Sequence, residues 1–286
     1  MPTVAGVEHR DVDVGGVRLH VAEAGDGPPL VLLHGWPQHW WCWRHLIPRL
    51  AQSYRVIAPD LRGFGWSGAP DGDYSKATFV ADILALLDAE GLDRVRLVGH
   101  DWGGFTAFLL AFDHPDRVER LVALDIVPPR GGLPTPRPRH LGIPIFASYQ
   151  VLLAAPVIGQ AALTSGTGLV RGIIRAGSGS GATWTDEELD AYATVLQEPA
   201  RARASSACYR TFLTRELPSM RAGGPVEELE VPTLLIMGEE SPLRRVLNPG
   251  SRSNLRVEQI AGAGHFLPEE APDEVFRLSG DWFAAG

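Results

Sequence analysis

Cysteine and positive charge are both scarce in this 286-residue chain, and each shortage excludes a class of protein. The two cysteines, Cys42 and Cys208, are too few for a disulfide framework and have no metal-ligand spacing around them. We therefore expect two free thiols and no metal. The formal net charge of -8 argues against nucleic acid or an anionic membrane as the main partner.

Long apolar runs are also missing. No uninterrupted apolar stretch approaches the roughly 20 residues that cross a bilayer. The first residues lack the charged segment and the apolar core of a signal peptide. The sequence thus predicts a soluble cytoplasmic protein without a membrane partner. Its hydrophobic fraction of 45% is typical of a chain with a packed interior.

Short apolar runs alternate with helical patterns through the first part of the chain, which predicts a mostly parallel sheet with helices on both faces. A hairpin is expected around Gly15-Gly16, because apolar and polar residues alternate on either side. Ser75 can cap a helix that Gly91 ends, and a second helix is expected over about 103–112. The runs expected to form strands are 30–33, 56–58, 95–98, 120–124, 232–237 and 255–260.

This α/β pattern is interrupted after Val127. Proline and glycine are too frequent over 128–144 for a regular element. The chain then looks helical to about Met220, with a capping box at Thr185 and Glu188, and the Gly/Ser stretch 177–181 is expected to be a mobile loop. We therefore divide the chain into an α/β core and an inserted helical subdomain. The predicted ranges are 1–127 and 223–286 for the core and 128–222 for the insert.

Asp101 stands where a buried strand gives way to a helix, between Gly99 and Gly103. This is the form of a nucleophile elbow, a sharp turn that lifts one side chain to the carboxyl edge of the sheet. The elbow usually carries serine. A carboxylate is already ionised near neutral pH and suits displacement at an sp³ carbon, which forms an alkyl ester. The alternative interpretation is an aspartate that only caps the following helix.

His265 follows the last predicted strand and the glycine-rich segment 261–264. Such a loop lets an imidazole reach the elbow. A neutral imidazole can take a proton from water, and a carboxylate on its other nitrogen fixes the tautomer. The sequence therefore predicts that His265 is a general base.

Three motifs resemble, in order and spacing, those of the α/β-hydrolase-fold epoxide hydrolases. They are His34-Gly35-Trp36-Pro37, Gly99-His100-Asp101-Trp102-Gly103-Gly104 and Gly264-His265-Phe266. The resemblance implies the α/β-hydrolase fold with a helical cap, Asp101 as nucleophile, His265 as base, and no metal or organic cofactor. It also implies that the backbone N–H groups of Trp36 and Trp102 form an oxyanion hole, which fits the position of Trp102 at the start of a helix.

The acid partner of His265 has two family positions. The usual one, after the strand ending at Met237, holds Ser241 in this chain. The other follows the strand ending at Leu124, where Asp125 stands. We predict Asp125, because the ends of adjacent parallel strands share one edge of the sheet. Glu239 and Glu240 remain the alternatives.

Two tyrosines of the insert match the family's cap motifs. They are Tyr149 in Ser148-Tyr149-Gln150 and Tyr209 in Cys208-Tyr209-Arg210. A neutral phenol can donate a hydrogen bond to the oxygen of an opening epoxide. The resemblance thus implies that a small-molecule epoxide is converted to a vicinal diol, through an alkyl-enzyme ester that water hydrolyses. The particular epoxide and the oligomeric state are left open.

Other activities remain as alternatives. Haloalkane dehalogenases use the same Asp, Trp and His, but need a second halide donor, often an Asn where this chain has Trp36. Fluoroacetate dehalogenases need arginines just after the nucleophile, where Trp102 and Phe105 stand. The aspartate elbow disfavours a serine esterase. A non-catalytic small-molecule binder would have no need of both Asp101 and His265.

Overall fold

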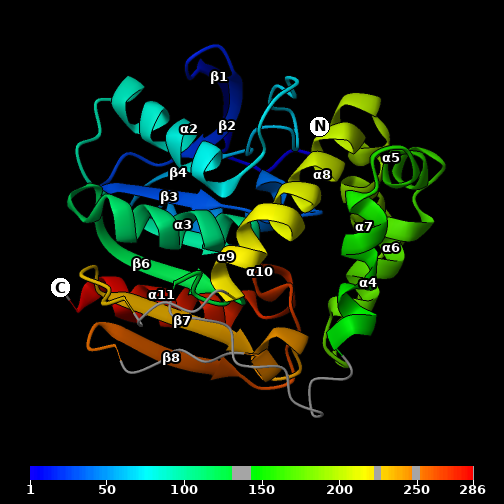
Figure 1. The fold of residues 1–286 in the computed structure, drawn as a ribbon. Helices are drawn as coiled ribbons and strands as arrows, with labels where there is room; N and C mark the ends of the chain where they lie inside the picture. The colour runs from blue at the N-terminus through cyan, green and yellow to red at the C-terminus, as the bar shows by residue number, and fades with distance from the viewer. Residues whose placement is uncertain (131–142, 222–226, 247–251, 286) are drawn as a thin grey trace.

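The computed structural model describes the chain except for residues 131–142, 222–226, 247–251 and 286. Its centre is an eight-stranded sheet in the order β1-β2-β4-β3-β5-β6-β7-β8 (Figure 1). β2 pairs antiparallel with both β1 and β4, and the remaining pairs are parallel. The strands are β1 (Glu8–Asp13), β2 (Arg18–Ala24), β3 (Pro29–Leu33), β4 (Arg55–Pro59), β5 (Val95–His100), β6 (Val118–Leu124), β7 (Thr233–Gly238) and β8 (Leu255–Ile260).

The central strands are buried on both faces. All residues of β7 and four of the five residues of β3 are buried, without alternation of polar and apolar side chains. Uniform burial explains why these strands are continuous apolar runs in the sequence. Each strand predicted from such a run is confirmed to within two residues at either end.

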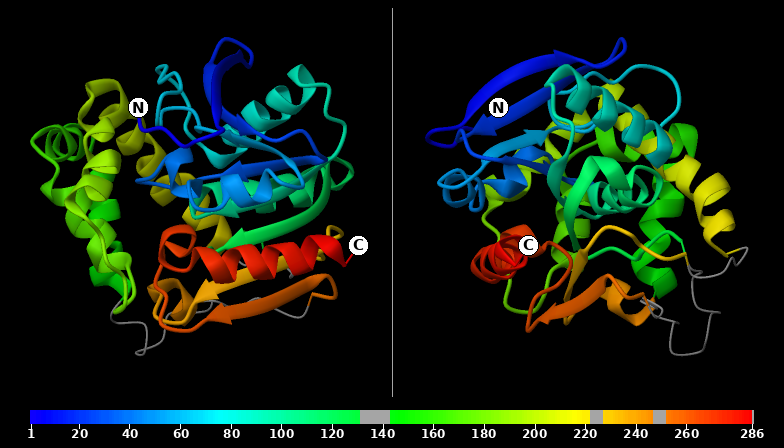
Figure 2. Two further views of the ribbon diagram at one scale, coloured as in Figure 1. Left: turned by 180° about the vertical axis from the view of Figure 1, so that it is seen from behind. Right: turned by 90° about the vertical axis from the view of Figure 1, so that its left-hand side faces the viewer.

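Helices cover the two faces of the sheet, as predicted. α2 (Lys76–Ala89) and α3 (Trp102–Asp113) lie on one face, and α1 (Ile47–Leu50) and α11 (Pro272–Ala284) lie on the other (Figures 1 and 2). Ser75 Oγ accepts a hydrogen bond from Thr78 N at the start of α2, which confirms the predicted cap. This layered arrangement places the carboxyl ends of the parallel strands at one common edge.

The first helices between β6 and β7 lie beyond that edge, on the right in Figure 1, and the last ones run back toward the sheet. The predicted capping box between Thr185 and Glu188 is confirmed. The predicted boundary at 222/223 and most of the proline-rich segment lie outside the described residues, so the division into core and cap stays a prediction. The helices are α4 (Ile143–Ala154), α5 (Pro156–Thr164), α6 (Gly168–Gly177), α7 (Asp186–Ala193), η4 (Val195–Gln197), α8 (Pro199–Thr211), the π-helical turn Phe212–Glu216 and α9 (Leu217–Arg221).

Residues 178–181 lie in the connection between α6 and α7, in agreement with the predicted loop, and this loop is hydrogen-bonded to the core. Gly177 O accepts a 2.7 Å hydrogen bond from His265 N, and Gly179 N donates one of 2.7 Å to Glu270. Ser180 donates from both its backbone N and its Oγ to Glu240. The glycines therefore serve close packing of this segment against the core, not chain flexibility.

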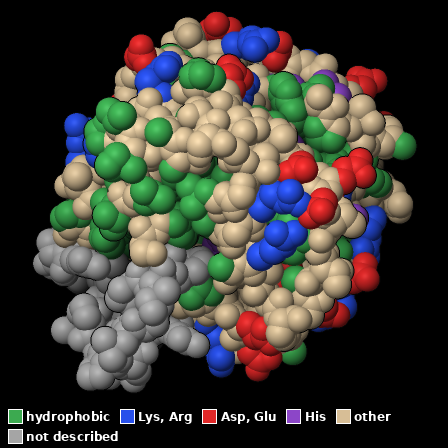
Figure 3. Space-filling view, turned by 90° about the vertical axis from the view of Figure 1, so that its right-hand side faces the viewer, with side chains coloured by type: hydrophobic (Ala, Val, Ile, Leu, Met, Phe, Trp, Pro, Cys, Tyr) green, Lys and Arg blue, Asp and Glu red, His purple; other side chains and the backbone are tan. Residues whose placement is uncertain are grey.

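The outer face of the insert carries a group of apolar side chains beside the undescribed residues (Figure 3). Val151, Val157 and Ile158 of α4 and α5 are exposed. Within the described parts of the chain, no helix is both long enough and apolar enough to cross a membrane. Cys42 and Cys208 are buried free thiols, as predicted.

Candidate active site

Asp101 lies between the end of β5 and the start of α3. Its φ of +50° is unusual for a residue with a side chain, which is the strain expected of a sharp strand-to-helix turn. α3 begins so close to β3 that a Cβ on Gly103 would overlap the backbone oxygen of Leu33. The turn leaves the Asp101 side chain 13% exposed at the carboxyl edge of the sheet.

The two oxygens of the Asp101 carboxylate have different partners. Oδ1 accepts a 2.9 Å hydrogen bond from Trp36 N, and Oδ2 lies 3.6 Å from His265 Nε2. The backbone N–H of Trp102 also helps to lower the pKa of the carboxylate. Burial alone would raise the pKa of Asp101, but hydrogen bonding and charge from His265 lower it below its ordinary value. Asp101 is therefore ionised at neutral pH.

His265 is buried between two carboxylates. Its Nδ1 donates a 2.6 Å hydrogen bond to Asp125 Oδ2, while Nε2 faces Asp101. Burial lowers the pKa of His265, but both carboxylates raise it, and the result is a pKa of about 10. The imidazole is consequently protonated at neutral pH while Asp101 carries its charge.

Asp125 is the first residue after β6, and its φ of +43° turns its fully buried side chain toward His265. Gly238 N donates to its Oδ1 at 3.1 Å, and Ser241 Oγ donates to Oδ2 at 2.6 Å. Glu239 accepts from Gly262 N instead, and Glu240 accepts from Ser180. The structure thus brings Asp125, and neither glutamate, to His265.

Tyr149 on α4 and Tyr209 on α8 meet above the elbow. Their hydroxyls lie 3.5 Å apart, and Tyr209 is the donor. The Tyr149 ring stacks on Trp36 at 5.7 Å, and the Tyr209 ring packs edge-on against Trp36 and Trp102. Burial and then the charge of Asp101 raise the pKa of Tyr149 to about 12, and burial raises that of Tyr209 well above its ordinary value. Both phenols therefore keep their protons at neutral pH.

Other residues, which were not predicted as site residues, bond to the site. Ser205 Oγ accepts a 3.1 Å hydrogen bond from Trp36 Nε1, and His100 Nε2 donates one of 2.8 Å to His265 O. Ser241 could have been found from the sequence, because it occupies the family's usual acid position. Lys76 carried no such signal.

Lys76 lies at the start of α2 and is fully buried against the site. Its Nζ sits 3.9 Å from the centre of the Trp102 ring and 2.9 Å from Glu216 Oε2. A cation on an indole face is a favourable contact in a dry environment. Lys76 thereby links α2 to the π-helical turn that follows α8.

Several groups that could act together in a reaction lie at this edge of the sheet. They comprise an ionised carboxylate, a histidine held by a second carboxylate, two backbone donors and two phenols. Among the residues that the structure describes, no group of three or more metal-binding side chains is present. The set suits covalent attack by a carboxylate followed by hydrolysis of the ester.

The sequence of the chain is similar to those of known proteins. A family model described as the alpha/beta hydrolase fold matches residues 28–149. The soluble epoxide hydrolase of Corynebacterium sp. (strain C12) is 32% identical, over 97% of this chain and 98% of its own length. The chain belongs to the α/β-hydrolase-fold epoxide hydrolase family.

Members of this family and their neighbours share the architecture closely. The solved structure of epoxide hydrolase CorEH without ligand matches with a TM-score of 0.86 and 31% identity, over 98% of this chain and 99% of that one. A fluoroacetate dehalogenase of Burkholderia sp is also 32% identical, over 96% of this chain and 92% of its own. The predicted α/β-hydrolase fold is confirmed. The relatives thus include both an epoxide hydrolase and a dehalogenase.

Proposed function

We propose that this α/β hydrolase converts a small-molecule epoxide to a vicinal diol through an ester on Asp101. The observation that carries the proposal is the pair of phenol hydroxyls, 3.5 Å apart on the insert side of the carboxylate. Two donors at this separation can each lie about 2.8 Å from a single acceptor oxygen. An epoxide oxygen held there would place a ring carbon toward Asp101.

In the first step, Asp101 Oδ2 forms a bond to one epoxide carbon. Oδ2 is the attacking oxygen because Trp36 N holds Oδ1 at 2.9 Å. The carbon–oxygen bond of the ring breaks, and the released alkoxide takes a proton from Tyr149 or Tyr209. Donors placed where charge develops lower the barrier most when they are fixed beforehand. The rings of both tyrosines are fixed by packing on Trp36.

Ester formation also prepares His265 for its own role. It removes the charge of Asp101, one of the two carboxylates that raise the pKa of His265. The imidazolium can then return a proton to the tyrosinate through solvent and become a base. Neutral His265, held by Asp125, takes a proton from a water molecule that attacks the Asp101 carbonyl carbon. The N–H groups of Trp36 and Trp102 stabilise the oxyanion. When this intermediate collapses, the bond from the Asp101 carbonyl carbon to the former Oδ2 breaks, His265 gives its proton to the departing alkoxide, and the diol leaves with the former Oδ2.

A dehalogenase is the second candidate, favoured by the identity to the fluoroacetate dehalogenase. Two features speak against it. Trp102 and Phe105 stand where such enzymes carry arginines for the substrate carboxylate. Trp36 Nε1 already donates to Ser205, so of the two indoles only that of Trp102 has an N–H without a partner among the described residues. A halide released at this site would therefore lack a second indole donor.

The insert over 128–222 is proposed to act as a cap that supplies Tyr149 and Tyr209 to the site. A non-catalytic binder of the same fold is the remaining alternative. Neither that alternative nor a purely structural insert requires two phenols facing an ionised carboxylate.

The decisive assay pairs diol formation with halide release on matched panels of epoxides and halogenated analogues. We expect diol and no halide. A His265→Gln variant should accumulate an alkyl adduct on the peptide that contains Asp101, detected by mass spectrometry. Halide release without epoxide turnover would favour the dehalogenase, and absence of any adduct over the whole panel would favour the binder.

A further inference from the structure

Glu270, at the end of α10 (Leu267–Glu270), binds the backbone on both sides of His265. Its Oε2 accepts from Gly264 N at 2.8 Å, and its Oε1 accepts from Phe266 N at 2.8 Å. Oε2 also accepts from Gly179 N of the insert at 2.7 Å. One carboxylate therefore satisfies three backbone donors, two of which flank the proposed base.

The insert segment that Glu270 holds is itself pressed against the His265 loop. His265 N donates to Gly177 O at 2.7 Å, so the backbone of the base is bonded directly to the insert. A Cβ on Gly264 would overlap Gly179 N, and a Cβ on Gly179 would overlap Gly262 O. Only glycine allows the two backbones to approach this closely. The contact is thus a fixed joint between insert and core.

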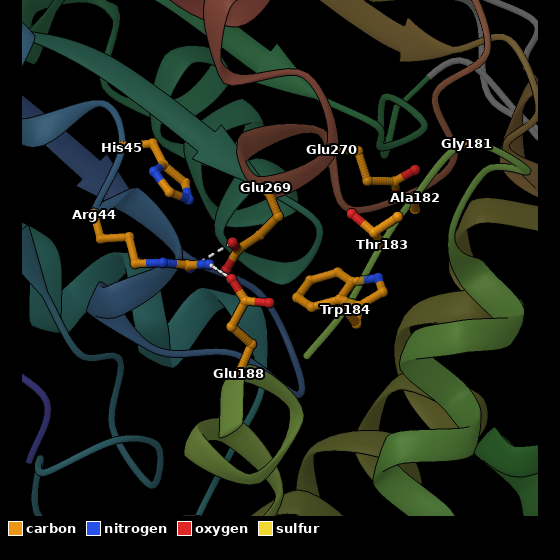
Figure 4. Close-up of a pocket in the computed structure, with 9 residues that line it drawn as sticks. All are labelled: Arg44, His45, Gly181, Ala182, Thr183, Trp184, Glu188, Glu269 and Glu270. Atoms are coloured by element: carbon orange, nitrogen blue, oxygen red, sulfur yellow. Dashed lines mark hydrogen bonds and ion pairs between the residues drawn. The ribbon is translucent and has the colours of Figure 1, made fainter. Parts of the chain in front are cut away.

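The same joint borders a polar cavity of about 110 Å³ (Figure 4). The cavity is lined from the core by Arg44 and Glu269 and from the insert by Glu188 and the segment that includes Gly181. Arg44 pairs with both glutamates there. Glu270 lies on the opposite side of this cavity from Arg44, so its carboxylate is not needed to neutralise that arginine. Among the described residues, its hydrogen bonds are those to the three backbone N–H groups.

We propose that Glu270 is a positioning residue for His265, and that the insert segment 177–181 completes the support of the base. The inference rests on the proposed function, because in that cycle His265 acts only when the ester is hydrolysed. A misplacement of the imidazole then slows the second step and spares the first. A loss of general structure would slow both steps, since Asp101 and the tyrosines serve the alkylation.

The test is a rapid-quench comparison of wild type with Glu270→Gln, using an epoxide that the wild type turns over. Glutamine keeps the shape but offers one acceptor oxygen, and its amide nitrogen would face a backbone N–H. We expect the rate constant of ester hydrolysis to fall by about tenfold or more, because small misplacements of a catalytic group carry penalties of this size. The alkylation rate constant should change by less than about twofold, so adduct on Asp101 accumulates at steady state. Glu274→Gln, which loses only an exposed pair with Arg277, is the matched control and should keep wild-type partitioning.

A second variant approaches the joint from the insert side. Gly179→Ala adds a methyl group where the two backbones touch and should give the same selective loss of ester hydrolysis. Gly172→Ala is its control, because a Cβ there meets nothing within 4 Å. This pair keeps the inference testable if Glu270→Gln does not fold.

The outcomes separate the inference from the function on which it rests. An equal fall of both rate constants in Glu270→Gln and Gly179→Ala, or no change in either, would overturn the positioning role. In both cases wild type would still form and hydrolyse an adduct. If no variant and no wild-type sample forms an adduct with any epoxide, the proposed function itself fails and this inference falls with it.

Discussion

Ser241 donates a 2.6 Å hydrogen bond to the Asp125 oxygen that also binds His265. Ser241 occupies the position where many relatives carry the acid itself. In this chain the proposed acid is Asp125, one strand earlier, and the residue at the usual position bonds to it through a hydroxyl. The two positions meet because β6 and β7 are parallel neighbours whose carboxyl ends share an edge.

Replacing Ser241 by alanine tests this support. The change removes a hydrogen bond to a charged group and leaves Leu243 N without its acceptor. We predict a loss of about 2 kcal/mol in the free energy of unfolding and slower ester hydrolysis, measured by urea unfolding and rapid quench. Ser219→Ala, at an exposed site on α9, should change stability by less than about 0.5 kcal/mol. Equal stability of the two variants would contradict the assignment.

The raised pKa of His265 makes stability depend on pH. The folded value of about 10 exceeds the ordinary value of 6.5, so the folded state binds the proton more tightly between them. The stabilising contribution is complete below about pH 6.5 and is lost as the pH rises toward about 10. Asp101, whose pKa is lowered, contributes above its ordinary value of 3.8 and loses that contribution on acidification.

The measurement is urea unfolding of wild type and His265→Gln across this range. We predict that the difference between their free energies of unfolding shrinks steadily as the pH rises from about 6.5 to about 10. A difference that stays constant over the range would show that His265 is not held as an imidazolium in the folded state.

The phenol hydroxyls can be removed without disturbing the rings. Tyr149→Phe and Tyr209→Phe keep the packing on Trp36 and lose only the donors. Each change should slow alkylation of Asp101 by about 10-fold to 1000-fold, as expected for loss of a transition-state donor. Single-turnover adduct formation measures the effect, with Tyr54→Phe in the core as the control. Alkylation at the wild-type rate in both variants would remove the tyrosines from the mechanism.

Lys76 is predicted to matter through its buried charge. Lys76→Met leaves the Glu216 carboxylate without its cation, and breaking a buried pair in this way costs about 3–5 kcal/mol. The double variant Lys76→Met/Glu216→Gln should recover part of that loss, because no unpaired charge remains. Thermal or urea unfolding of both variants gives the comparison. A double variant less stable than the single one would mean that the hydrogen bond from Lys76 N to Glu216, and not the ion pair, dominates.

The sheet could be predicted from the sequence because parallel strands buried on both faces are continuous apolar runs. Continuous apolar runs that lead toward Asp101 and Asp125 predict that both side chains lie at one edge of the sheet. The elbow could be recognised because the turn between β5 and α3 requires small residues on either side of the aspartate.

Contacts between distant backbones could not be predicted in the same way. In the sequence Gly179 and Gly264 look like ordinary loop glycines. Their backbones come into contact only when the insert packs against the core. Glu270 binds backbone N–H groups, which every residue but proline carries, so no pattern marks its partners. Lys76 is buried by three aromatic rings from two other segments, α3 and the π-helical turn, whereas a lysine near a helix start is ordinarily solvent-exposed.

The covalent ester on Asp101 is the central claim, and one turnover in ¹⁸O-labelled water with enzyme in excess over epoxide tests it most directly. The account predicts that the diol from this first turnover carries no label and that the label appears in the Asp101 carboxylate. Later turnovers would then pass the label to the diol. Label in the diol from the first turnover would contradict the account, because it would mean that water attacks the epoxide directly.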